Sequence, residues 1–339
     1  MITTMKAGRF HRGVDGVNKL TIDDVAVPEP GQGQVRIKVM ADGVCLTDVH
    51  ILSGGLVTPF QPPVVTLGHE VSGVIEKLGE GVTDHHVGQR VAMFWTEMRG
   101  RDLYSIGMDV DGGWAQYVVV TADLAIDIGP DIPFDQAAII PDAVSTPWAA
   151  ITTTAEIRAS ETVGVWGLGG LGYHAIKLLR LVGAAPIIGV DPIPAARDRA
   201  LQAGADFVLD PNASDFQQQM LAATSGRGLN AAFDFAGYGP VRQQAFDALA
   251  GHGRLVLVGI TPDDLVIGPS ALISAYGKRI LGHYASEKHH VEEIIRLVGI
   301  GRLDFSGSIT GTYPLVDAQD AIDRLASKAG DPIRLVLIP

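Results

Sequence analysis

The sequence predicts an α/β protein of two domains, one rich in β-strands and one built as a doubly wound parallel sheet. Three observations favour this class: a length of 339 residues, short strand-like segments up to about residue 120, and a regular strand–helix alternation from about residue 143. With 47% apolar residues, a chain of this length can bury a sizeable core. No internal repeat and no low-complexity segment is present.

Short strands separated by turns make up the N-terminal part. Alternating or apolar patterns predict strands at 35–39, 71–76 and 114–120. Clusters rich in glycine and proline at 28–33 and 79–84 predict turns. We therefore expect this part of the chain to be mostly β-structure.

Apolar strands alternate with helices in the following part. The helix after Gly172 carries apolar side chains at the spacing of one helical face. Buried-type strands are predicted at 162–166, 186–191, 207–210, 231–235 and 254–259. This alternation indicates parallel strands joined by helical crossovers. A last strand-like segment is predicted at 331–338.

A glycine-rich motif, Gly167-Leu-Gly-Gly-Leu-Gly172, lies between a predicted strand and a predicted helix, the context in which it binds dinucleotides. Gly167 permits the tight turn, Gly169 lets backbone amides approach a pyrophosphate, and Gly172 lets helix and strand pack closely. Gly170 and Leu171 complete the turn at the helix N-terminus, where the helix dipole stabilises phosphate charge.

An aspartate, Asp191, lies 19 residues after Gly172, at the end of the next predicted strand. A carboxylate there hydrogen-bonds the adenosine ribose hydroxyls and repels a 2′-phosphate, which favours NAD over NADP. Arg197 and Arg199 leave some NADP binding open. The alternative interpretation is that no cofactor binds here and that the motif is only a glycine-rich turn, with Asp191 a solvated residue in the loop that follows the next strand.

Composition excludes several kinds of partner. Lys and Arg number 26 against 38 Asp and Glu, so the net charge of −12 leaves no electrostatic footprint for nucleic acid or anionic lipid. No apolar run reaches the roughly 18 residues of a membrane span, and the N-terminus has no apolar run of signal-peptide type. The single cysteine, Cys45, excludes an intrachain disulfide and favours a cytoplasmic protein.

Two short strings offer metal ligands. Cys45 lies in Gly43-Val-Cys-Leu-Thr-Asp-Val-His50 and His69 lies in Gly68-His-Glu70; a thiolate and an imidazole are typical zinc ligands. A lone cysteine is more often a small buried side chain than a ligand. Both strings, however, resemble the zinc-ligand pattern of alcohol dehydrogenases in the medium-chain dehydrogenase/reductase superfamily. The chain is similar to this superfamily from end to end.

The resemblance implies a domain organisation and an activity. It implies a GroES-like β-rich catalytic domain at 1–142 and about 285–339, with a doubly wound Rossmann NAD-binding domain at about 143–284. It also implies a homodimer or homotetramer. The expected reaction is reversible hydride transfer between a primary or secondary alcohol and NAD, with the carbonyl compound as the product of oxidation.

The ligand set is implied by the same resemblance. Many relatives use a second cysteine as the third ligand, and this chain has none. The stretch around Asp142 resembles members in which an aspartate supplies that bond. The implied ligands are therefore Cys45, His69 and Asp142, with water or a substrate oxygen in the fourth position. Glu70 adjoins the site, where it would ligate transiently or pair with Arg334.

A proton relay is implied by two positions that match the superfamily. Thr47 would accept the proton of the alcohol, and His50 would deliver it to solvent through the cofactor ribose. The alternative for His50 is an exposed residue after a metal loop. Asp48 is the expected partner that fixes the tautomer of His69.

Two cofactor contacts rest on the resemblance alone. Thr146, four residues after Asp142, is expected behind the nicotinamide ring. Arg334 resembles a C-terminal arginine that reaches either the cofactor phosphates or Glu70. Neither role follows from local sequence pattern.

Two stretches depart from the family pattern. Many relatives bind a structural zinc through four cysteines in a stretch where residues 94–107 contain none, so one catalytic zinc and no structural zinc are expected. This stretch must be ordered by other contacts or be mobile, and Trp95 and Tyr104 are candidates for the substrate pocket or a subunit contact. Relatives commonly carry a small residue where this chain has His283, followed by Tyr284. These two residues are expected either to reshape the nicotinamide or dimer region or to be ordinary packing residues.

Three other functions compete with alcohol oxidation. The zinc-free quinone and enoyl reductases use NADPH and lack the ligands Cys45, His69 and Asp142. Zinc-containing reductases of an activated alkene or iminium are closer, but they often lose relay residues such as Thr47. A crystallin-like binding protein that keeps only cofactor affinity needs no metal triad. The sequence does not identify the substrate, because pocket walls come from loops without a transferable code.

Overall fold

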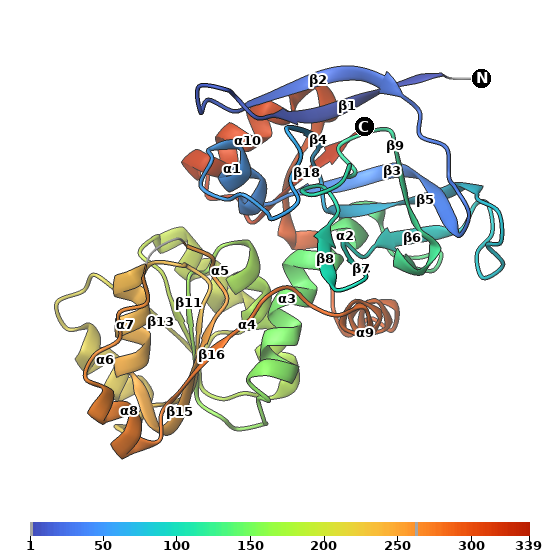
Figure 1. Ribbon diagram of the computed structural model, residues 1–339. Coiled ribbons are helices and arrows are strands. Elements are labelled where there is room, and N and C mark those ends of the chain that lie inside the picture. The colour runs from blue at the N-terminus through green and yellow to red at the C-terminus, as the bar shows by residue number, and fades with distance from the viewer. Residues whose placement is uncertain (1–2, 262–263) are drawn as a thin grey trace. The chain divides into compact units, whose positions relative to one another are not determined.

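A computed structural model describes residues 3–261 and 264–339 of the chain. The chain forms two compact units, Met1–Ala143 with Glu287–Pro339 and Val144–Ser286, so the first unit is discontinuous in sequence (Figure 1). Among the helices that the structure describes, none combines the length and apolar character needed to cross a bilayer.

The first unit is built mainly from antiparallel strands. Its strands are β1 Thr4–His11, β2 Lys19–Ala26, β3 Gln34–Val44, β4 Val64–Thr66, β5 Glu70–Leu78, β6 Arg90–Met93, β7 Thr96–Arg99, β8 Asp102–Ser105, β9 Tyr117–Thr121, β10 Ala125–Asp127, β17 Ile309–Pro314 and β18 Arg334–Ile338. They form a sheet in the order β2-β1-β4, a larger sheet in the order β10-β6-β5-β3-β18-β17 with β9 paired to β3, and the hairpin β7-β8. Its helical segments are α1 Leu46–Leu52, η1 Ala122–Leu124, α2 Phe134–Ile139, η2 Ile140–Val144, α9 Lys288–Gly299, η4 Ser306–Ser308, η5 Leu315–Asp317 and α10 Ala318–Ser327.

Strand β3 is the centre of the larger sheet. It pairs with β5, β9 and β18, and its alternating apolar side chains Val35, Ile37 and Val39 are buried. Gly43 of β3 lies opposite Glu70 of β5 in the register. This register brings the residues just after β3 and just before β5 to the same end of the sheet.

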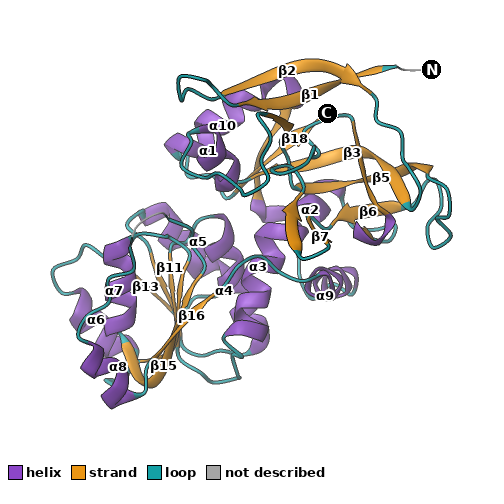
Figure 2. Ribbon diagram, in the orientation of Figure 1, coloured by secondary structure: helices purple, strands orange, loops and turns teal. Residues whose placement is uncertain are grey.

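The second unit is a parallel sheet with helices on both faces (Figure 2). Its strands are β11 Val163–Trp166, β12 Ile187–Val190, β13 Phe207–Leu209, β14 Leu229–Asp234, β15 Leu249–Leu257 and β16 Arg279–Gly282. Its helical segments are α3 Ser145–Ala149, η3 Ala150–Thr154, α4 Gly170–Val182, α5 Pro194–Ala203, α6 Phe216–Ala223, α7 Gly239–Asp247 and α8 Ser270–Tyr276. The strand order β13-β12-β11-β14-β15-β16, with every pair parallel, is the Rossmann order and confirms the predicted doubly wound sheet.

Several element boundaries differ from the sequence-based expectation: β3 runs to Val44 rather than to residue 39, β15 begins at Leu249 rather than at residue 254, and β18 begins at Arg334 rather than at residue 331. Strand β9 begins at Tyr117 rather than at residue 114. The reason is that the preceding residues pair with β1 instead: the Gly8 amide donates to the Trp114 carbonyl at 2.6 Å, and Ala115 bridges to Ala7. Helix α4 begins at Gly170, inside the glycine motif rather than after it.

Candidate active site

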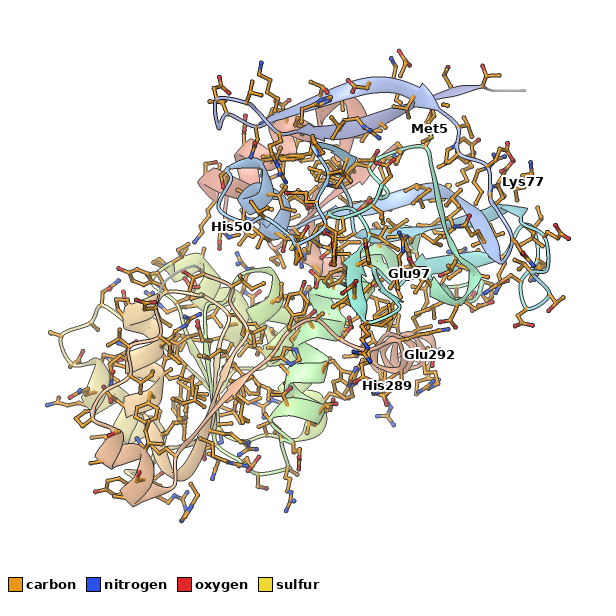
Figure 3. All side chains as sticks on the ribbon, in the orientation of Figure 1. Met5, His50, Lys77, Glu97, His289 and Glu292 are labelled. Atoms are coloured by element: carbon orange, nitrogen blue, oxygen red, sulfur yellow. The ribbon has the colours of Figure 1, made fainter. Side chains whose placement is uncertain are left out.

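Cys45 lies at the junction of β3 and α1, where it is the N-cap residue of the helix. Asp48, in the first turn of α1, accepts a hydrogen bond from the Cys45 amide at 2.9 Å through Oδ2. This contact fixes the backbone from which the thiol projects. Thr47 Oγ1 lies 3.5 Å from Cys45 Sγ, whereas His50 is exposed in the last turn of the helix (Figure 3).

His69 is held by a tight turn before β5. Gly68 has a φ of +99°, and a Cβ there would lie 2.3 Å from both Asp42 Oδ2 and a ring carbon of Trp114, so only glycine fits. Asp42 is fully buried and accepts a hydrogen bond from the Glu70 amide at 3.3 Å. The turn therefore places His69 and Glu70 in fixed directions.

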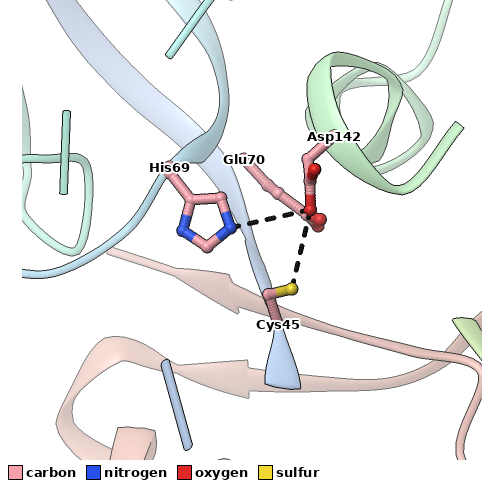
Figure 4. A group of neighbouring side chains, drawn as sticks. All are labelled: Cys45, His69, Glu70 and Asp142. Atoms are coloured by element: carbon pink, nitrogen blue, oxygen red, sulfur yellow. Dashed lines mark hydrogen bonds and ion pairs between the residues drawn. The ribbon is translucent and has the colours of Figure 1, made fainter. Parts of the chain in front are cut away.

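Four potential ligands converge in the first unit: Cys45, His69, Glu70 and Asp142 (Figure 4). One ligand atom from each lies within 4.8 Å of all the others, and all four residues are buried. Asp142 Oδ2 is 3.6 Å from Cys45 Sγ and 3.7 Å from His69 Nε2. Two ligands of a tetrahedral zinc stand about 3.3–3.5 Å apart for bond lengths near 2.0–2.3 Å. The donor set of one thiolate, one imidazole and carboxylate oxygens thus fits zinc in both chemistry and spacing.

Glu70 and Arg334 form a buried ion pair beside this cluster. Arg334 Nη2 lies 2.9 Å from Glu70 Oε1 and 3.9 Å from Asp142 Oδ2. Burial raises the pKa of the Glu70 carboxyl well above its ordinary value, even though Arg334 acts in the opposite direction. Arg334 belongs to β18, and its nearest charged partners are carboxylates of the cluster.

The His69 ring has a carboxylate on each side. Its Nδ1 is 3.5 Å from Asp48 Oδ1, and its Nε2 faces Asp142. Burial lowers the pKa of His69, but the Asp48 and Asp142 carboxylates outweigh that effect and raise it well above the ordinary value. A partner at Nδ1 orients the ring so that Nε2 is directed into the cluster, as in metal sites generally.

The glycine motif of the second unit has the geometry that a pyrophosphate requires. Gly167 has a φ of +85°, and a Cβ on Gly172 would lie 1.8 Å from the Gly167 carbonyl oxygen, which explains both glycines. A Cβ on Gly169 would meet nothing within 4 Å, so space remains above the N-terminus of α4. A dinucleotide phosphate fits this turn.

Asp191 follows β12 and is bound to the same turn. Its Oδ2 accepts from the Leu168 amide at 2.8 Å, and its Oδ1 accepts from the Ile193 amide at 2.8 Å. Arg197 donates to the Asp191 carbonyl at 2.7 Å and lies 3.5 Å from Asp210. The side chain of Asp191 is therefore anchored next to the glycine motif, and Arg197 is already held by two partners.

Thr146 is a buried residue of α3, in the second unit. Its carbonyl accepts hydrogen bonds from the Ala150 amide and from His283 Nε2. The sequence pattern gave no indication of the contact with His283, because the two residues are 137 positions apart.

Three neighbours of the cluster have roles that the sequence did not indicate, although Trp95 was expected as a candidate for the substrate pocket or a subunit contact. The Trp95 ring lies 5.5 Å from the His69 ring, and its Nε1 donates to the Pro141 carbonyl at 3.2 Å. Gly43 provides the space for Glu70, since a Cβ there would be 1.9 Å from Glu70 Oε2. Asp42 carries no local signal beyond being an acidic residue near the end of β3.

Residues 94–107 are ordered by contacts within the first unit. They contain the hairpin β7-β8, which is tied down by the buried carboxylate of Asp109. Asp109 accepts from the Ser105 amide at 2.8 Å and from the Phe60 amide at 3.2 Å. Tyr104 stacks on Phe60 with ring centroids 4.3 Å apart. Of the two alternatives for this stretch, order through other contacts is the one observed.

Comparisons with known proteins agree with this architecture. Residues 31–130 match the alcohol dehydrogenase GroES-like domain, and residues 170–299 match the zinc-binding dehydrogenase family. The chain is 30% identical to L-threonine 3-dehydrogenase of Pyrococcus furiosus over 329 residues, covering 91% of this chain and 92% of the relative. It is 30% identical to NAD-dependent alcohol dehydrogenase of Sulfurisphaera tokodaii over 357 residues, covering 98% and 100%.

A solved structure extends the comparison to the whole fold. A proposed zinc-binding dehydrogenase from Sinorhizobium meliloti 1021, bound to NADP, superimposes with a TM-score of 0.90 at 27% identity, and all of both chains is covered. A GroES-like unit with a buried zinc-type ligand cluster, together with a Rossmann unit, defines a metal-dependent dehydrogenase of the NAD(P) type. The chain belongs to the zinc-binding alcohol dehydrogenases of the medium-chain dehydrogenase/reductase superfamily. Its zinc site is the cluster of cysteine, histidine, glutamate and aspartate described above.

Proposed function

We propose that this chain oxidises a primary or secondary alcohol with NAD and catalyses the reverse reduction of the carbonyl compound. The observation that carries this proposal is the convergence of Cys45, His69 and Asp142, one ligand atom each, in a buried site. The Rossmann unit supplies the second requirement, a dinucleotide turn. Alcohol and L-threonine dehydrogenases among the relatives support alcohols or amino alcohols as the substrate class.

In this proposal Cys45, His69 and Asp142 hold one zinc ion. A zinc ion at this position supplies Lewis-acid chemistry, which lowers the pKa of an alcohol hydroxyl. Glu70 lies in the same cluster and pairs with Arg334, so as a transient ligand it would exchange this ion pair for a bond to the metal. Asp48 orients His69 and at the same time holds the Cys45 backbone.

Thr47 and His50 move the proton of the alcohol in this proposal. Thr47 Oγ1 would accept the proton of the alcohol and release its own hydroxyl proton toward the cofactor ribose; its hydroxyl lies 3.5 Å from Cys45 Sγ, beside the metal cluster. His50 passes the proton to solvent, which its exposed position on α1 allows. Zinc reductases of an activated alkene or iminium are the alternative function, and they would not depend on this pair.

NAD is the proposed cofactor, held by Gly167, Gly169, Gly170, Leu171 and Gly172. Asp191 would bind the adenosine ribose and repel a 2′-phosphate. Thr146 would lie behind the nicotinamide ring, and Arg334 would act through Glu70 rather than on the cofactor phosphates. Both cofactors occur among similar proteins, since one relative is named NAD-dependent and one structure is bound to NADP.

We further propose that the enzyme holds one zinc per chain, with no structural zinc, and forms a homodimer or homotetramer. The single cysteine and the ordered hairpin β7-β8 support the first point, because Asp109 and Tyr104 hold the stretch for which the family resemblance implies a second metal in many members. Elemental analysis should give a zinc ratio near one. A ratio near two would contradict the assignment.

Alcohol-dependent reduction of NAD tests the proposed function directly. A panel of primary alcohols, secondary alcohols and amino alcohols is assayed by NADH absorbance, with NADP in parallel. We expect kcat/KM with NAD to exceed that with NADP by at least about a hundredfold, since a few kcal/mol of discrimination corresponds to that ratio. A zinc-loaded protein that oxidises no alcohol but reduces activated alkenes or iminium compounds would establish the alternative.

Proton transfer is tested with Thr47→Val, which keeps the side-chain shape and removes the hydroxyl. Turnover should fall by about 10²–10⁴-fold, the range typical of positioned proton transfer. His50→Gln should have a smaller effect, and imidazole buffer should restore part of the rate. Zinc content is measured for both variants. Full turnover of Thr47→Val, with a deuterium isotope effect showing that hydride transfer is limiting, would contradict the relay.

A further inference from the structure

His283 is the residue directly after strand β16, and its side chain contacts the helical segment at the start of the second unit. Its backbone amide donates to the Leu257 carbonyl at 3.0 Å, which anchors it to the end of β15. The imidazole Nδ1 lies 2.8 Å from Thr154 Oγ1, and Nε2 lies 3.0 Å from the Thr146 carbonyl oxygen. One side chain therefore contacts both the start of α3 and the end of η3.

The chemistry of the two partners fixes the direction of both hydrogen bonds. A carbonyl oxygen only accepts, so His283 Nε2 must carry the hydrogen and donate to Thr146. In the neutral ring Nδ1 is then an acceptor, and the Thr154 hydroxyl donates to it. The imidazole is thus held in one tautomer and one orientation across the segment.

The helical segment is irregular at this point. Pro147 has no N–H, and η3 is a π-type segment, so the regular pattern of α-helical hydrogen bonds is interrupted here. The Ala150 amide is shared between the carbonyls of Pro147 and Thr146. His283 adds a side-chain donor to the Thr146 carbonyl and so ties this irregular segment to the end of β16.

A second contact ties the same two segments together. Ser286 Oγ lies 2.8 Å from Ser145 Oγ, one residue before Thr146. The residues that follow β16 are therefore attached to α3 at two successive positions. Thr146 itself is buried, with 5% of its surface exposed, so its position follows the backbone that these contacts hold.

We propose that His283 is a positioning residue that fixes Thr146 and, through it, the nicotinamide half of the bound cofactor. This inference rests on the proposed function, which places Thr146 behind the nicotinamide ring. His283 acts on the backbone of Thr146 and has no role at the adenosine half, which depends on Asp191 and the glycine motif.

The test compares two ligands, NAD and ADP-ribose, which lacks the nicotinamide ring. In the zinc-loaded protein, His283→Ala should weaken NAD binding roughly three- to tenfold, the effect of removing one or two hydrogen bonds. Binding of ADP-ribose should change by less than about twofold, because its contacts do not involve Thr146. His283→Gln should restore part of the NAD affinity, since its amide can donate to the carbonyl and accept from Thr154. Equal losses for both ligands would show a general structural defect and overturn the proposal, as would unchanged NAD binding.

A second pair of variants keeps the test independent of the folding of His283→Ala. Thr154→Val removes the hydroxyl that holds Nδ1, whereas Thr154→Ser retains it. The valine variant should weaken NAD selectively and the serine variant should bind as wild type; identical behaviour of the two would overturn the proposal. His289→Ala, which removes an exposed imidazole of α9, is the matched control. Wild-type protein that binds NAD but oxidises no alcohol would contradict the proposed function. The changes in NAD and ADP-ribose affinity would still decide the role of His283.

Discussion

A small number of side chains determines whether the first unit can hold a metal ion. Cys45, His69 and Asp142 come from three separate elements, and each has a buried neighbour that fixes its direction. For Asp142 the neighbour is Trp95, whose indole donates to the carbonyl of the preceding residue. The ligand geometry therefore depends on contacts that are not themselves ligands.

Replacement of Asp142 tests the third ligand. We expect Asp142→Ala to lose most of its zinc on dialysis, because two protein ligands rarely hold zinc against solvent. Elemental analysis of the dialysed protein checks this, with Asp131→Ala, an exposed aspartate, as the control. Retention of both zinc and activity by Asp142→Ala would show that Glu70 or another group is the third ligand instead.

Gly43 tests the space around Glu70. An alanine Cβ at this position would lie 1.9 Å from Glu70 Oε2 and 2.9 Å from Glu70 Cβ, so the glutamate must move. We expect Gly43→Ala to lower the free energy of unfolding by about 1–3 kcal/mol, the usual effect of overpacking. Gly299→Ala is the control: its Cβ would meet nothing within 4 Å, and alanine favours the helix. Equal denaturation midpoints for the two variants would show that the Glu70 pocket adapts.

At the scale of the elements, the strings that carry the ligands could be predicted, but their convergence could not. Strands β3 and β5 follow from alternating apolar residues, and the glycine motif follows from its position between a strand and a helix. The register that sets Gly43 opposite Glu70 is a long-range pairing, which local pattern does not encode. The π-type segments η2 and η3 were also not predicted, because a widened helical turn has no local sequence signal; the His283 contact to Thr154 of η3, for example, spans 129 positions.

An ion pair of the second unit links three of its elements. Arg254 of β15 donates to Glu161 Oε2 at 2.6 Å, to the Asn230 carbonyl at 3.0 Å and to the Ala155 carbonyl. Burial raises the pKa of Glu161, but the hydrogen bonds from Arg254 and from the Arg158 amide outweigh burial and lower it below 4.5. A lowered pKa means that the carboxylate stabilises the fold above about pH 4.5 and that this contribution disappears as the pH falls through the folded-state pKa.

Glu161→Gln tests this pH dependence. We expect the free energy of unfolding of the variant to be about 1–2 kcal/mol lower than that of the wild type at pH 7, because solvent only partly screens the Glu161–Arg254 pair. The difference from wild type should shrink as the pH is lowered below about 4. Urea denaturation at several pH values measures it, with the exposed Glu80→Gln as the control. A difference that is constant from pH 7 to pH 3 would show that the carboxylate charge is not the stabilising factor.

For the whole molecule, the fold class and the order of its domains were predictable because they depend on repeated local patterns. The strand–helix alternation after residue 143 indicated the parallel sheet, and the sheet has the Rossmann order. The return of Glu287–Pro339 to the first unit was implied by resemblance alone, because no local feature marks it. The neighbours Trp95 and His283 were also beyond local pattern, since their roles arise from contacts across long stretches of sequence.

The metal-binding side chains belong to the first unit and the dinucleotide turn belongs to the second. Zinc and a bound dinucleotide should therefore stabilise different parts of the chain. A ligand that binds only the folded state stabilises it by about 2.7 kcal/mol at a hundred times its Kd. Removal of zinc with a chelator should therefore speed amide hydrogen exchange at 43–52, 68–74 and 140–143, where the ligands and their supporting turns lie. ADP-ribose should slow exchange at 166–173 and 190–193 without reversing the effect of the chelator. Peptide-resolved exchange of wild type measures both effects, and Asp142→Ala without chelator should reproduce the pattern of zinc removal. If the chelator accelerated exchange equally in both units, zinc would stabilise both of them. The inference that zinc stabilises only the first unit would then be wrong.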